Sequence, residues 1–399
     1  GVDMAVLKSL NTISDNSDNV KYEKGSYSLS KIVTEVTNEL LTDSAELVTD
    51  AYYDKKQRSC LEKRILYILD NQQYFAVGSK RKMIKSIFDF MFGYGQLQEY
   101  IEDDEISDID GVRHNCFSIT KNGIRIPIDI DFNSESEFNV YCKLIALRNG
   151  GILNENDNHC RVADLENKLR INLSIYPRNI SGPAISIRKH RQIAYNMDDL
   201  VRLKMLDTTC KELITELLLN DKTIILCGKG GSGKTTLLRA LINILPKMER
   251  VLIVESDAEL YPDKANCIEQ RVKRDNEGGN PITLEMLIKD GLTMSLDTYC
   301  IGEIVGNESM AFLNACCCGH RFLTTMHSNK PQDSASRLIA LARRGVGTTD
   351  EKMLTWMFCE GVDAIIHMNK FKVMEIVCVK GYDSSNQEPE YDLIYRRNI

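Results

Sequence analysis

The pattern of apolar and polar positions separates a polar tail from a helical region at the start of the chain. Residues 1–27 are rich in Asn, Asp and Ser with few large apolar side chains, which predicts a flexible tail. Over residues 28–92 apolar side chains recur at helical spacing, as in Ile32, Val36 and Leu40, and no proline interrupts them. We therefore expect a helical module over 28–92.

Short β-prone runs replace the helical pattern over residues 93–190. The runs CFSIT and IRIPIDI flank Lys121-Asn122-Gly123, and an Asn-Gly pair between such runs predicts a hairpin turn. This region is expected to be an α+β domain. Residues 191–207 are polar with one short helical stretch, and we expect them to form a linker.

From residue 208 to 399, strand-like apolar runs alternate with helical segments. This alternation predicts a parallel α/β domain that continues to the C-terminus. A length of 399 residues also exceeds what one hydrophobic core usually organises. The predicted fold class is thus an α/β domain preceded by an α+β domain and an all-helical module.

Composition narrows the classes of function. Hydrophobic residues make up 43% of the chain and charged residues 27%, which excludes a largely disordered or fibrous protein. A formal net charge of -7 provides no basic field, so direct nucleic-acid binding is not expected. No apolar run approaches the about 20 residues that span a bilayer, so any membrane association would be peripheral, through partners.

Cysteine usage indicates a reducing compartment. The thirteen cysteines are odd in number, and no secretory signal precedes them, so we expect reduced cytosolic thiols. The consecutive Cys316, Cys317 and Cys318 do not have the spacing of a metal site. We interpret these three as small buried hydrophobic residues.

A glycine-rich loop carries the strongest chemical signal. The sequence GKGGSGKT at 228–235 follows the apolar run TIILC and precedes the helical run LLRALINIL, which is the order of a phosphate-binding loop. Its glycines let backbone N–H groups face phosphates above a helix N-terminus. Lys234 would neutralise the β- and γ-phosphates, and the Thr235 hydroxyl would coordinate Mg²⁺. The predicted nucleotide-binding residues here are Gly228, Gly230, Gly231, Ser232, Gly233, Lys234, Thr235 and Thr236.

The base is expected to be adenine. Guanine-specific proteins carry an NKxD motif, and the nearest stretch here, Asn369-Lys370-Phe371-Lys372, has lysine in place of the aspartate. We therefore expect ATP with Mg²⁺. The alternative for the loop is a glycine-rich turn that contains a lysine by chance.

Two further apolar runs end in carboxylates. The run VLIV at 251–254 precedes an acidic stretch from Glu255 to Glu259, and TYCI precedes Gly302 and Glu303. Because ligand groups collect at the carboxyl ends of parallel strands, one of the first acids could polarise the attacking water; a solvated acidic loop is the alternative. Glu303 is expected to hold Mg²⁺ from a strand beside the phosphate-loop strand.

A histidine follows the next strand-like run, FLTTM at 322–326. His327 is either a structural loop residue or a sensor that hydrogen-bonds the γ-phosphate or its water. The residues alone leave both interpretations open.

Taken together, these motifs resemble the type II/IV secretion ATPase superfamily, and most nearly the CpaF-like motors of Tad-type pili. The four motifs come in the family's order: Walker A at 228–235, an Asp-box VESDAEL, a Walker B IGEIVGNES and a His-box GHRFLTTMHSN. Upstream, YGQLQEYIEDDEISDI and LRINLSIYPRNISGPAISIRK are similar to segments that open and close the family's N-terminal domain. The resemblance covers about residues 93–380.

The resemblance implies an architecture and an activity. It implies a PAS-like N-terminal domain, a linker and a RecA-like motor domain, assembled as a homohexamer with nucleotide between the two domains. It also implies ATP hydrolysis that drives pilus assembly or protein secretion through inner-membrane platform proteins, from the cytoplasmic face of the cell membrane. By position in the motifs, Glu259, Glu303 and His327 would be catalytic, and Arg170 and Arg188 would face nucleotide.

The chain departs from the family at several arginines. The stretch from 292 to 298 has none, Val305 replaces one after Walker B, and Asp164 stands where many relatives have another. The Asp-box has Ser256 in place of an acid. Arginines that stabilise transferred phosphate contribute about 10³ to 10⁵ in rate, so their loss would slow turnover. The intact phosphate loop and the retained glutamates still favour nucleotide binding and some hydrolysis. Two alternatives stay open, namely a nucleotide-binding structural or regulatory subunit with little turnover, and a conjugation-type DNA-transfer motor, which the acidic charge disfavours.

Overall fold

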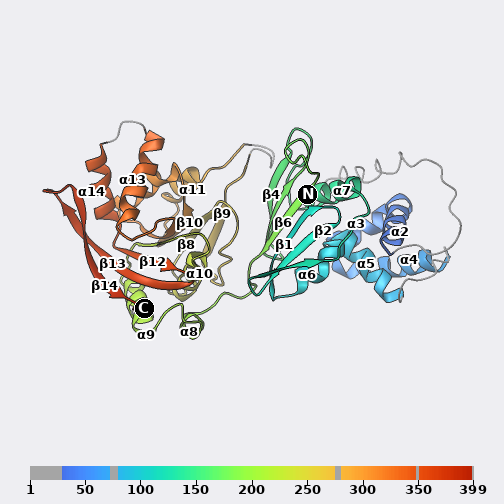
Figure 1. The fold of residues 1–399 in the computed structure, drawn as a ribbon, viewed down its shortest axis with the longest axis horizontal. Helices are drawn as coiled ribbons and strands as arrows, with labels where there is room; N and C mark the ends of the chain where they lie inside the picture. The colour runs from blue at the N-terminus through green and yellow to red at the C-terminus, as the bar shows by residue number, and fades with distance from the viewer. Residues whose placement is uncertain (1–28, 72–79, 275–279, 347–349, 398–399) are drawn as a thin grey trace. The chain divides into compact units, whose positions relative to one another are not determined.

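The structure is a computed structural model that divides into two compact units, residues 1–189 and 190–399 (Figure 1). The tail predicted over 1–27 lies outside the described residues, and the domain limits given above stay predictions. The structure describes residues 29–71, 80–274, 280–346 and 350–397.

Four helices form the first part of the first unit, where the apolar spacing predicted helices. They share one core in which Ile32, Leu40, Leu61, Ile65 and Ile87 have no exposed surface. Burial of one apolar stripe per helix is what makes such short helices stable. Their bounds are Leu29–Asp43 (α2), Ala45–Tyr53 (α3), Arg58–Asn71 (α4) and Lys80–Phe92 (α5).

The remainder of the first unit is built on a six-stranded antiparallel sheet with the order β3-β2-β1-β6-β5-β4. The predicted hairpin is confirmed, since Lys121 pairs with Ile124 while Asn122 and Gly123 have φ of +51° and +78°. The strands are Ile106–Arg113 (β1), Cys116–Lys121 (β2), Ile124–Ile128 (β3), His159–Asp164 (β4), Leu169–Ser174 (β5) and Ala184–Lys189 (β6).

Helix α7 (Glu135–Arg148) supplies much of the core beneath this sheet. The Ser134 hydroxyl caps its start by accepting the backbone N–H of Glu137 at 3.1 Å. Its Phe138 and Tyr141 are buried with Phe117 of β2. The short helices Gly95–Leu97 (η2) and Gln98–Glu102 (α6) precede the sheet.

The second unit is built on an eight-stranded sheet with the order β14-β13-β12-β7-β11-β10-β8-β9. The six strands from β12 to β9 are parallel, which confirms the α/β class. The strands are Ile224–Gly228 (β7), Val251–Glu255 (β8), Cys267–Arg271 (β9), Thr298–Ile304 (β10), Arg321–Met326 (β11), Ala364–Asn369 (β12), Lys372–Asp383 (β13) and Glu388–Arg396 (β14).

The C-terminal strands differ from the expectation of a wholly parallel sheet. Strands β12, β13 and β14 pair antiparallel. The connection between β12 and β13 consists of Lys370 and Phe371, both with positive φ. A two-residue turn can join only antiparallel strands, because a parallel crossover needs a dozen residues or more.

Helices cover both faces of this sheet. Ile224 and Leu226 of β7 point to one face and belong to a core with α8, α9 and α10, while Ile225 and Cys227 point to the other face and belong to a core with α11 to α14. Because neighbouring strand residues alternate between faces, an unbroken apolar run is what a strand covered on both sides requires. The helices are Met197–Arg202 (α8), Thr208–Leu219 (α9), Lys234–Ile244 (α10), Leu284–Gly291 (α11), Glu308–Cys317 (α12), Asp333–Val346 (α13) and Glu351–Gly361 (α14).

Several residues of the stretch predicted as a linker pack into the second unit. Met197, Leu200, Met205 and Leu206 are buried in its core. Buried apolar side chains hold this stretch to the unit that follows it.

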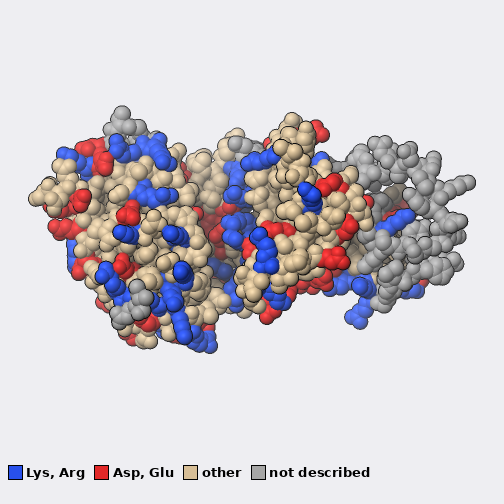
Figure 2. All heavy atoms as spheres, viewed as in Figure 1, with Lys and Arg blue, Asp and Glu red and all other residues tan. Residues whose placement is uncertain are grey.

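The surface charges, the helix lengths and the burial of three cysteines can be compared with what composition predicted. Figure 2 shows Lys and Arg interspersed with Asp and Glu over the visible face, without a field of one sign. Within the described ranges no helix is long and apolar enough to cross a bilayer. Cys316 is buried as expected, but Cys317 and Cys318 are exposed, because they lie at the C-terminal end of α12 where the helix leaves the core.

Candidate nucleotide site

The glycine-rich loop joins the end of β7 to the start of α10, and its backbone requires glycine at two positions. Gly228 has a φ of +152°, and a Cβ atom there would lie 2.3 Å from the Met368 carbonyl oxygen. Gly233 has a φ of +97°, and a Cβ atom would lie 2.8 Å from the Met205 side chain. These backbone conformations are open only to glycine, so the glycine spacing follows from the path of the loop.

The amino end of α10 is left open by the side chains around it. In the described structure no side chain caps this helix, whose N-cap residue is Gly233. The Ser232 hydroxyl is buried and, among the described residues, has no hydrogen-bond partner. First-turn N–H groups without a side-chain cap are the groups that bind phosphate at helix N-termini.

Lys234 places a cation in the same loop. Its side chain is buried, and its Nζ donates to the carbonyl oxygens of Gly228 and Lys229, each at 3.0 Å. No carboxylate of the described residues forms an ion pair with it. Burial lowers the pKa of this ammonium from its usual value, with a smaller opposing effect of Glu303. A buried cation held by neutral carbonyls is suited to receive an anion.

The other predicted loop residues lie beside these. Gly230 and Gly231 are exposed at the tip of the loop, and Gly231 also has a positive φ, of +71°. Thr235 and Thr236 lie on the first turn of α10 and are half-buried. The structure thus brings the predicted loop residues together around one helix N-terminus.

Glu303 and His327 meet next to Lys234. Nε2 of His327 lies 2.8 Å from Oε1 of Glu303, and both side chains are about two-fifths exposed, 42% and 39%. On the other side of the ring, Nδ1 lies 3.2 Å from the Gly228 oxygen and 3.5 Å from Nζ of Lys234. Nδ1 can donate to that carbonyl or accept from the lysine, depending on its protonation. His327 therefore bridges the phosphate loop and the carboxylate.

The sheet order corrects the expected position of Glu303. The strand that carries it, β10, does not lie beside β7, because β11 lies between them. Met326 of β11 pairs with Cys227 of β7 on one side and with Ile304 of β10 on the other. His327 follows Met326 and spans the gap that the intervening strand creates.

The Asp-box is held to its strand by Glu255. This carboxyl accepts the backbone N–H groups of Glu259 at 3.1 Å and Leu260 at 3.0 Å. Burial raises the pKa of Glu255 to about 8, against the lowering effect of these hydrogen bonds. Gly302 leaves room for it, since a Cβ atom there would lie 3.1 Å from Cγ of Glu255. Glu259, half-buried, is thus fixed by its backbone beside the strand of Glu303.

Sequence reasoning considered Glu255 only as one of the acids that could polarise the attacking water, and it did not identify Glu308 at all. Glu308 is buried, and its Oε1 accepts the N–H groups of Val305 at 2.5 Å and Gly306 at 2.7 Å. It fixes the loop directly after the Walker B strand. The sequence contained a signal for each residue: Glu255 ends a fully buried strand, and Glu308 follows a Gly-Asn turn at the start of a helix.

Arg170 and Arg188 lie in the first unit, on neighbouring strands and directly opposite each other in register. Nε of Arg188 is 2.9 Å from Oδ1 of Asp108 on the adjacent strand. Asp164 accepts the Tyr94 hydroxyl at 2.6 Å, which fixes the end of β4. The structure pairs the two arginines with each other in register, and their approach to nucleotide stays a prediction.

The residues fit a magnesium nucleotide better than a protein-bound metal. Among the described residues there is no cluster of three or more His, Cys, Asp and Glu side chains that could hold a metal ion. Mg²⁺ is commonly held by one or two protein oxygens and substrate phosphates, and the Thr235 hydroxyl and Glu303 are the oxygens that these elements offer. The uncapped helix and the unpaired lysine provide the matching phosphate contacts.

Comparisons with known proteins agree with this arrangement. VirB11 of Agrobacterium fabrum is 30% identical over 161 residues, which cover 39% of this chain and 47% of VirB11. The chain spans about half the length of the curated relatives it matches.

Two solved structures share the fold. The Legionella pneumophila ATPase DotB matches with a TM-score of 0.51 at 18% identity, over 72% of this chain and 80% of DotB. The pilus retraction motor PilT with bound ADP matches with a TM-score of 0.50 at 15% identity, over 75% of this chain and 82% of PilT. The predicted RecA-like fold class is thereby confirmed.

A family model described as type II/IV secretion system protein matches residues 156–373, which include the phosphate loop, both strand-end glutamates and His327. This stretch is more than half of the chain. The chain therefore belongs to the type II/IV secretion system protein family.

Proposed function

We propose that this protein is an ATP-hydrolysing motor subunit that powers secretion or pilus assembly. The observation that carries the proposal is the open phosphate loop, in which an uncapped helix N-terminus and an unpaired, desolvated Lys234 lie beside the His327–Glu303 pair. Together they offer a site for the phosphates and a carboxylate that His327 connects to the phosphate loop.

The roles follow from these contacts. Lys234 and the α10 N-terminus would bind the β- and γ-phosphates, and Thr235 with Glu303 would hold Mg²⁺, which when bound offsets phosphate charge. His327 contacts both the loop and Glu303, so loss of the γ-phosphate would change the surroundings of all three side chains. Glu259, held by Glu255, is proposed to act on the same nucleotide.

The wider assembly is part of the proposal. The family resemblance supports a homohexamer at the cytoplasmic face of the inner membrane, acting through membrane-embedded platform proteins, with Arg170 and Arg188 facing nucleotide. The acidic net charge and the mixed surface support a protein partner over nucleic acid. The Tad-pilus subtype stays a prediction from the motifs.

A second candidate is a nucleotide-gated scaffold with little turnover. It is favoured by the absence of arginine from 292 to 305 and by Val305, whose side chain is half-exposed at the end of the Walker B loop. Without an arginine at such a place, less positive charge is available to stabilise the transferred phosphate. Binding would then persist while hydrolysis is slow.

The test is steady-state ATP hydrolysis by the full chain with Mg²⁺, with oligomer size recorded in the same samples. We expect Glu303→Gln to lower turnover by about 100-fold or more while ATP still binds, and Lys234→Ala to weaken binding as well. A matched control is Glu388→Gln, an exposed glutamate on β14 that makes the same change of charge.

Each outcome has a distinct meaning. Turnover that depends on Glu303 supports the motor. ATP binding without turnover by the unaltered chain supports the scaffold. A Lys234→Ala protein that hydrolyses ATP at the normal rate would contradict both.

A further inference from the structure

A hollow of about 640 Å³ opens at the opposite edge of the second unit's sheet from the phosphate loop. Its wall contains residues at the amino ends of five parallel strands, including Thr223 before β7, Glu249 before β8 and Asp363 before β12. Parallel strands start at one edge and end at the other, so this hollow is separated from the nucleotide site by the length of the strands. No role assigned above uses it.

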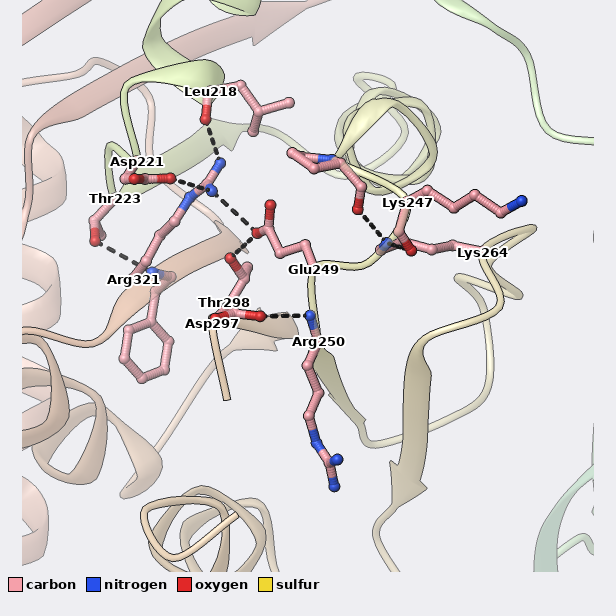
Figure 3. Close-up of polar contacts among 12 residues, drawn as sticks. Leu218, Asp221, Thr223, Lys247, Glu249, Arg250, Lys264, Asp297, Thr298 and Arg321 are labelled. Atoms are coloured by element: carbon pink, nitrogen blue, oxygen red, sulfur yellow. Dashed lines mark hydrogen bonds and ion pairs between the residues drawn. The ribbon is translucent and has the colours of Figure 1, made fainter. Parts of the chain in front are cut away.

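The floor of the hollow is a fixed ionic network. Arg321, at the start of β11, is buried, and its Nη1 lies 3.1 Å from both Asp221 and Glu249 (Figure 3). Its Nη2 donates to the Leu218 carbonyl at 2.6 Å, and Thr298 donates to Glu249. These contacts occupy both Nη atoms and the remaining Nε is buried, so the one arginine of the lining is not available to a ligand.

The hollow carries an excess of negative charge. Its lining has five carboxylates, of Asp221, Glu249, Asp297, Glu360 and Asp363, and one guanidinium, a formal balance of five minus one, or four negative charges.

Three of the carboxylates form ion pairs with two cations. Arg321 pairs with Asp221 and Glu249, and Lys222 lies 2.9 Å from Asp363. Asp297 receives only the backbone N–H of Arg250, at 2.7 Å, and within the described part of the chain no ion pair involves Glu360. Two carboxylates therefore remain for a cation from outside.

An apolar face lies directly beside Glu360 on α14. Met353 and Trp356 are 54% and 46% exposed, and Met353, Trp356 and Glu360 follow one another at spacings of three and four residues along α14. Such spacings place the three side chains on one face, while Leu354 and Phe358 are buried on the other. Trp356 is the only tryptophan of the chain. A half-exposed tryptophan beside an acidic pocket is the residue type that anchors protein interfaces.

We propose that the hollow and the exposed face of α14 form a docking surface for a basic segment of a partner protein. Lysine or arginine side chains enter the hollow towards Asp297 and Glu360, and an apolar side chain of the same segment packs on Trp356 and Met353. The acidic lining repels phosphate, so nucleotides and nucleic acids do not fit.

The partner is inferred from its charge. Segments that membrane proteins expose on the cytoplasmic side are enriched in lysine and arginine. On the proposed function, which this inference presupposes, the occupant is such a segment of a membrane-embedded component of the machine. The hollow would then receive the partner at one edge of the sheet while ATP binds at the other.

The probe is a synthetic peptide of lysines and arginines around one leucine and one phenylalanine, labelled with fluorescein and titrated with the full chain. A peptide with glutamates in place of the basic residues is the control ligand. We expect saturable binding of the basic peptide that weakens with salt, and a saturable change in the emission of Trp356 with unlabelled peptide. Binding of both peptides alike, or no change in Trp356 emission, would overturn the proposal.

Variants locate the binding. Glu360→Lys changes an exposed residue in the last turn of a helix, where a cation is favourable, and should weaken peptide binding about tenfold or more. Glu155→Lys makes the same change of charge at an exposed residue of the first unit and should leave binding within about twofold. Equal weakening by the two variants would overturn the proposal.

ATP turnover is measured in the same samples. Turnover that depends on Glu303, without peptide binding, would refute the docking surface alone. Specific peptide binding without turnover would refute the motor and keep the surface.

Discussion

Two glutamates whose side chains are little exposed lie at opposite ends of strand β8 and are stabilised in different ways. Glu249, before the strand, has a side chain that is 9% exposed and is paired with Arg321 and the Thr298 hydroxyl. Glu255, at the other end, is 6% exposed and receives only backbone N–H groups. Opposite charge compensates the first carboxyl, whereas the second keeps its proton at neutral pH in most molecules, because burial raises its pKa to about 8.

The two edges of the sheet therefore differ in how their charges are balanced, and only one of them can accept an anionic ligand. At the amino edge the charges are matched within the protein, so their geometry is fixed by one another. At the carboxyl edge no carboxylate of the described residues forms an ion pair with Lys234, and Glu255 avoids a buried charge by protonation. That edge can therefore receive an anion without first breaking a buried ion pair.

The largest expected effect comes from breaking the matched pair. Arg321→Met leaves Glu249 buried without its cation and should lower the free energy of unfolding by about 3–5 kcal/mol. Denaturant unfolding of the second unit measures this, and ATP binding by the folded fraction should be unchanged.

The matched control for that variant removes both charges. Arg321→Met combined with Glu249→Leu should be more stable than Arg321→Met alone, because no buried charge is left unpaired. If the double variant loses as much unfolding free energy as the two single variants lose together, the ion pair between Arg321 and Glu249 does not stabilise the amino edge.

The next effect is a pH dependence at the carboxyl edge. The pKa of Glu255 is raised in the folded state, so its contribution to stability is fully present below the unfolded-state value, near 4.5, and is lost as the pH rises to about 8. Glu255→Gln removes this titration. Between these two pH values, the free energy of unfolding of the variant relative to that of the unaltered chain should therefore rise by roughly 1.4 kcal/mol per pH unit. Unfolding free energies at pH 5, 6 and 7 test it, and a constant difference would contradict it.

The smallest effects concern the backbone of the phosphate loop. Gly233→Ala combines a positive φ with contacts under 3 Å to Met205 and Phe371, so we expect it to weaken ATP binding by about tenfold and to lower stability by about 1–2 kcal/mol.

Gly231→Ala is the matched control for loop crowding. Gly231 has a positive φ but open space around it. The Gly231→Ala variant should therefore lose only about 1 kcal/mol of unfolding free energy and should bind ATP more tightly than Gly233→Ala does. Equal effects at the two positions would show that conformation alone, without crowding, governs the loop.

The sequence predicts those features that depend on local pattern. The hairpin at Asn122 and Gly123 and the strand-loop-helix order around Lys234 follow from turn chemistry and periodicity. In the same way, the end of an apolar run marks Glu303 as a strand-end carboxylate.

The order of strands in the sheet is not contained in such patterns. Nothing near Glu303 in the sequence indicates that β11 lies between its strand and β7, because strand pairing is decided by residues far along the chain. Likewise the antiparallel pairing of β13 depends on the two-residue turn at Lys370 and Phe371, which composition does not distinguish from a longer loop. The ion pair between Glu249 and Arg321 also cannot be read from local patterns, because the two residues lie far apart along the chain.

The position of β7 in the sheet has a consequence for how the protein is made. Both neighbours of β7, namely β11 and β12, are synthesised long after it, and the hydrogen bond that the backbone N–H of Phe322 donates to the Thr223 hydroxyl spans 99 positions. While the chain emerges from a ribosome, the phosphate-loop strand has neither of these two partner strands until Met326 has been added. Nascent chains released before that point should therefore fail to bind nucleotide although the whole GKGGSGKT loop is present in them.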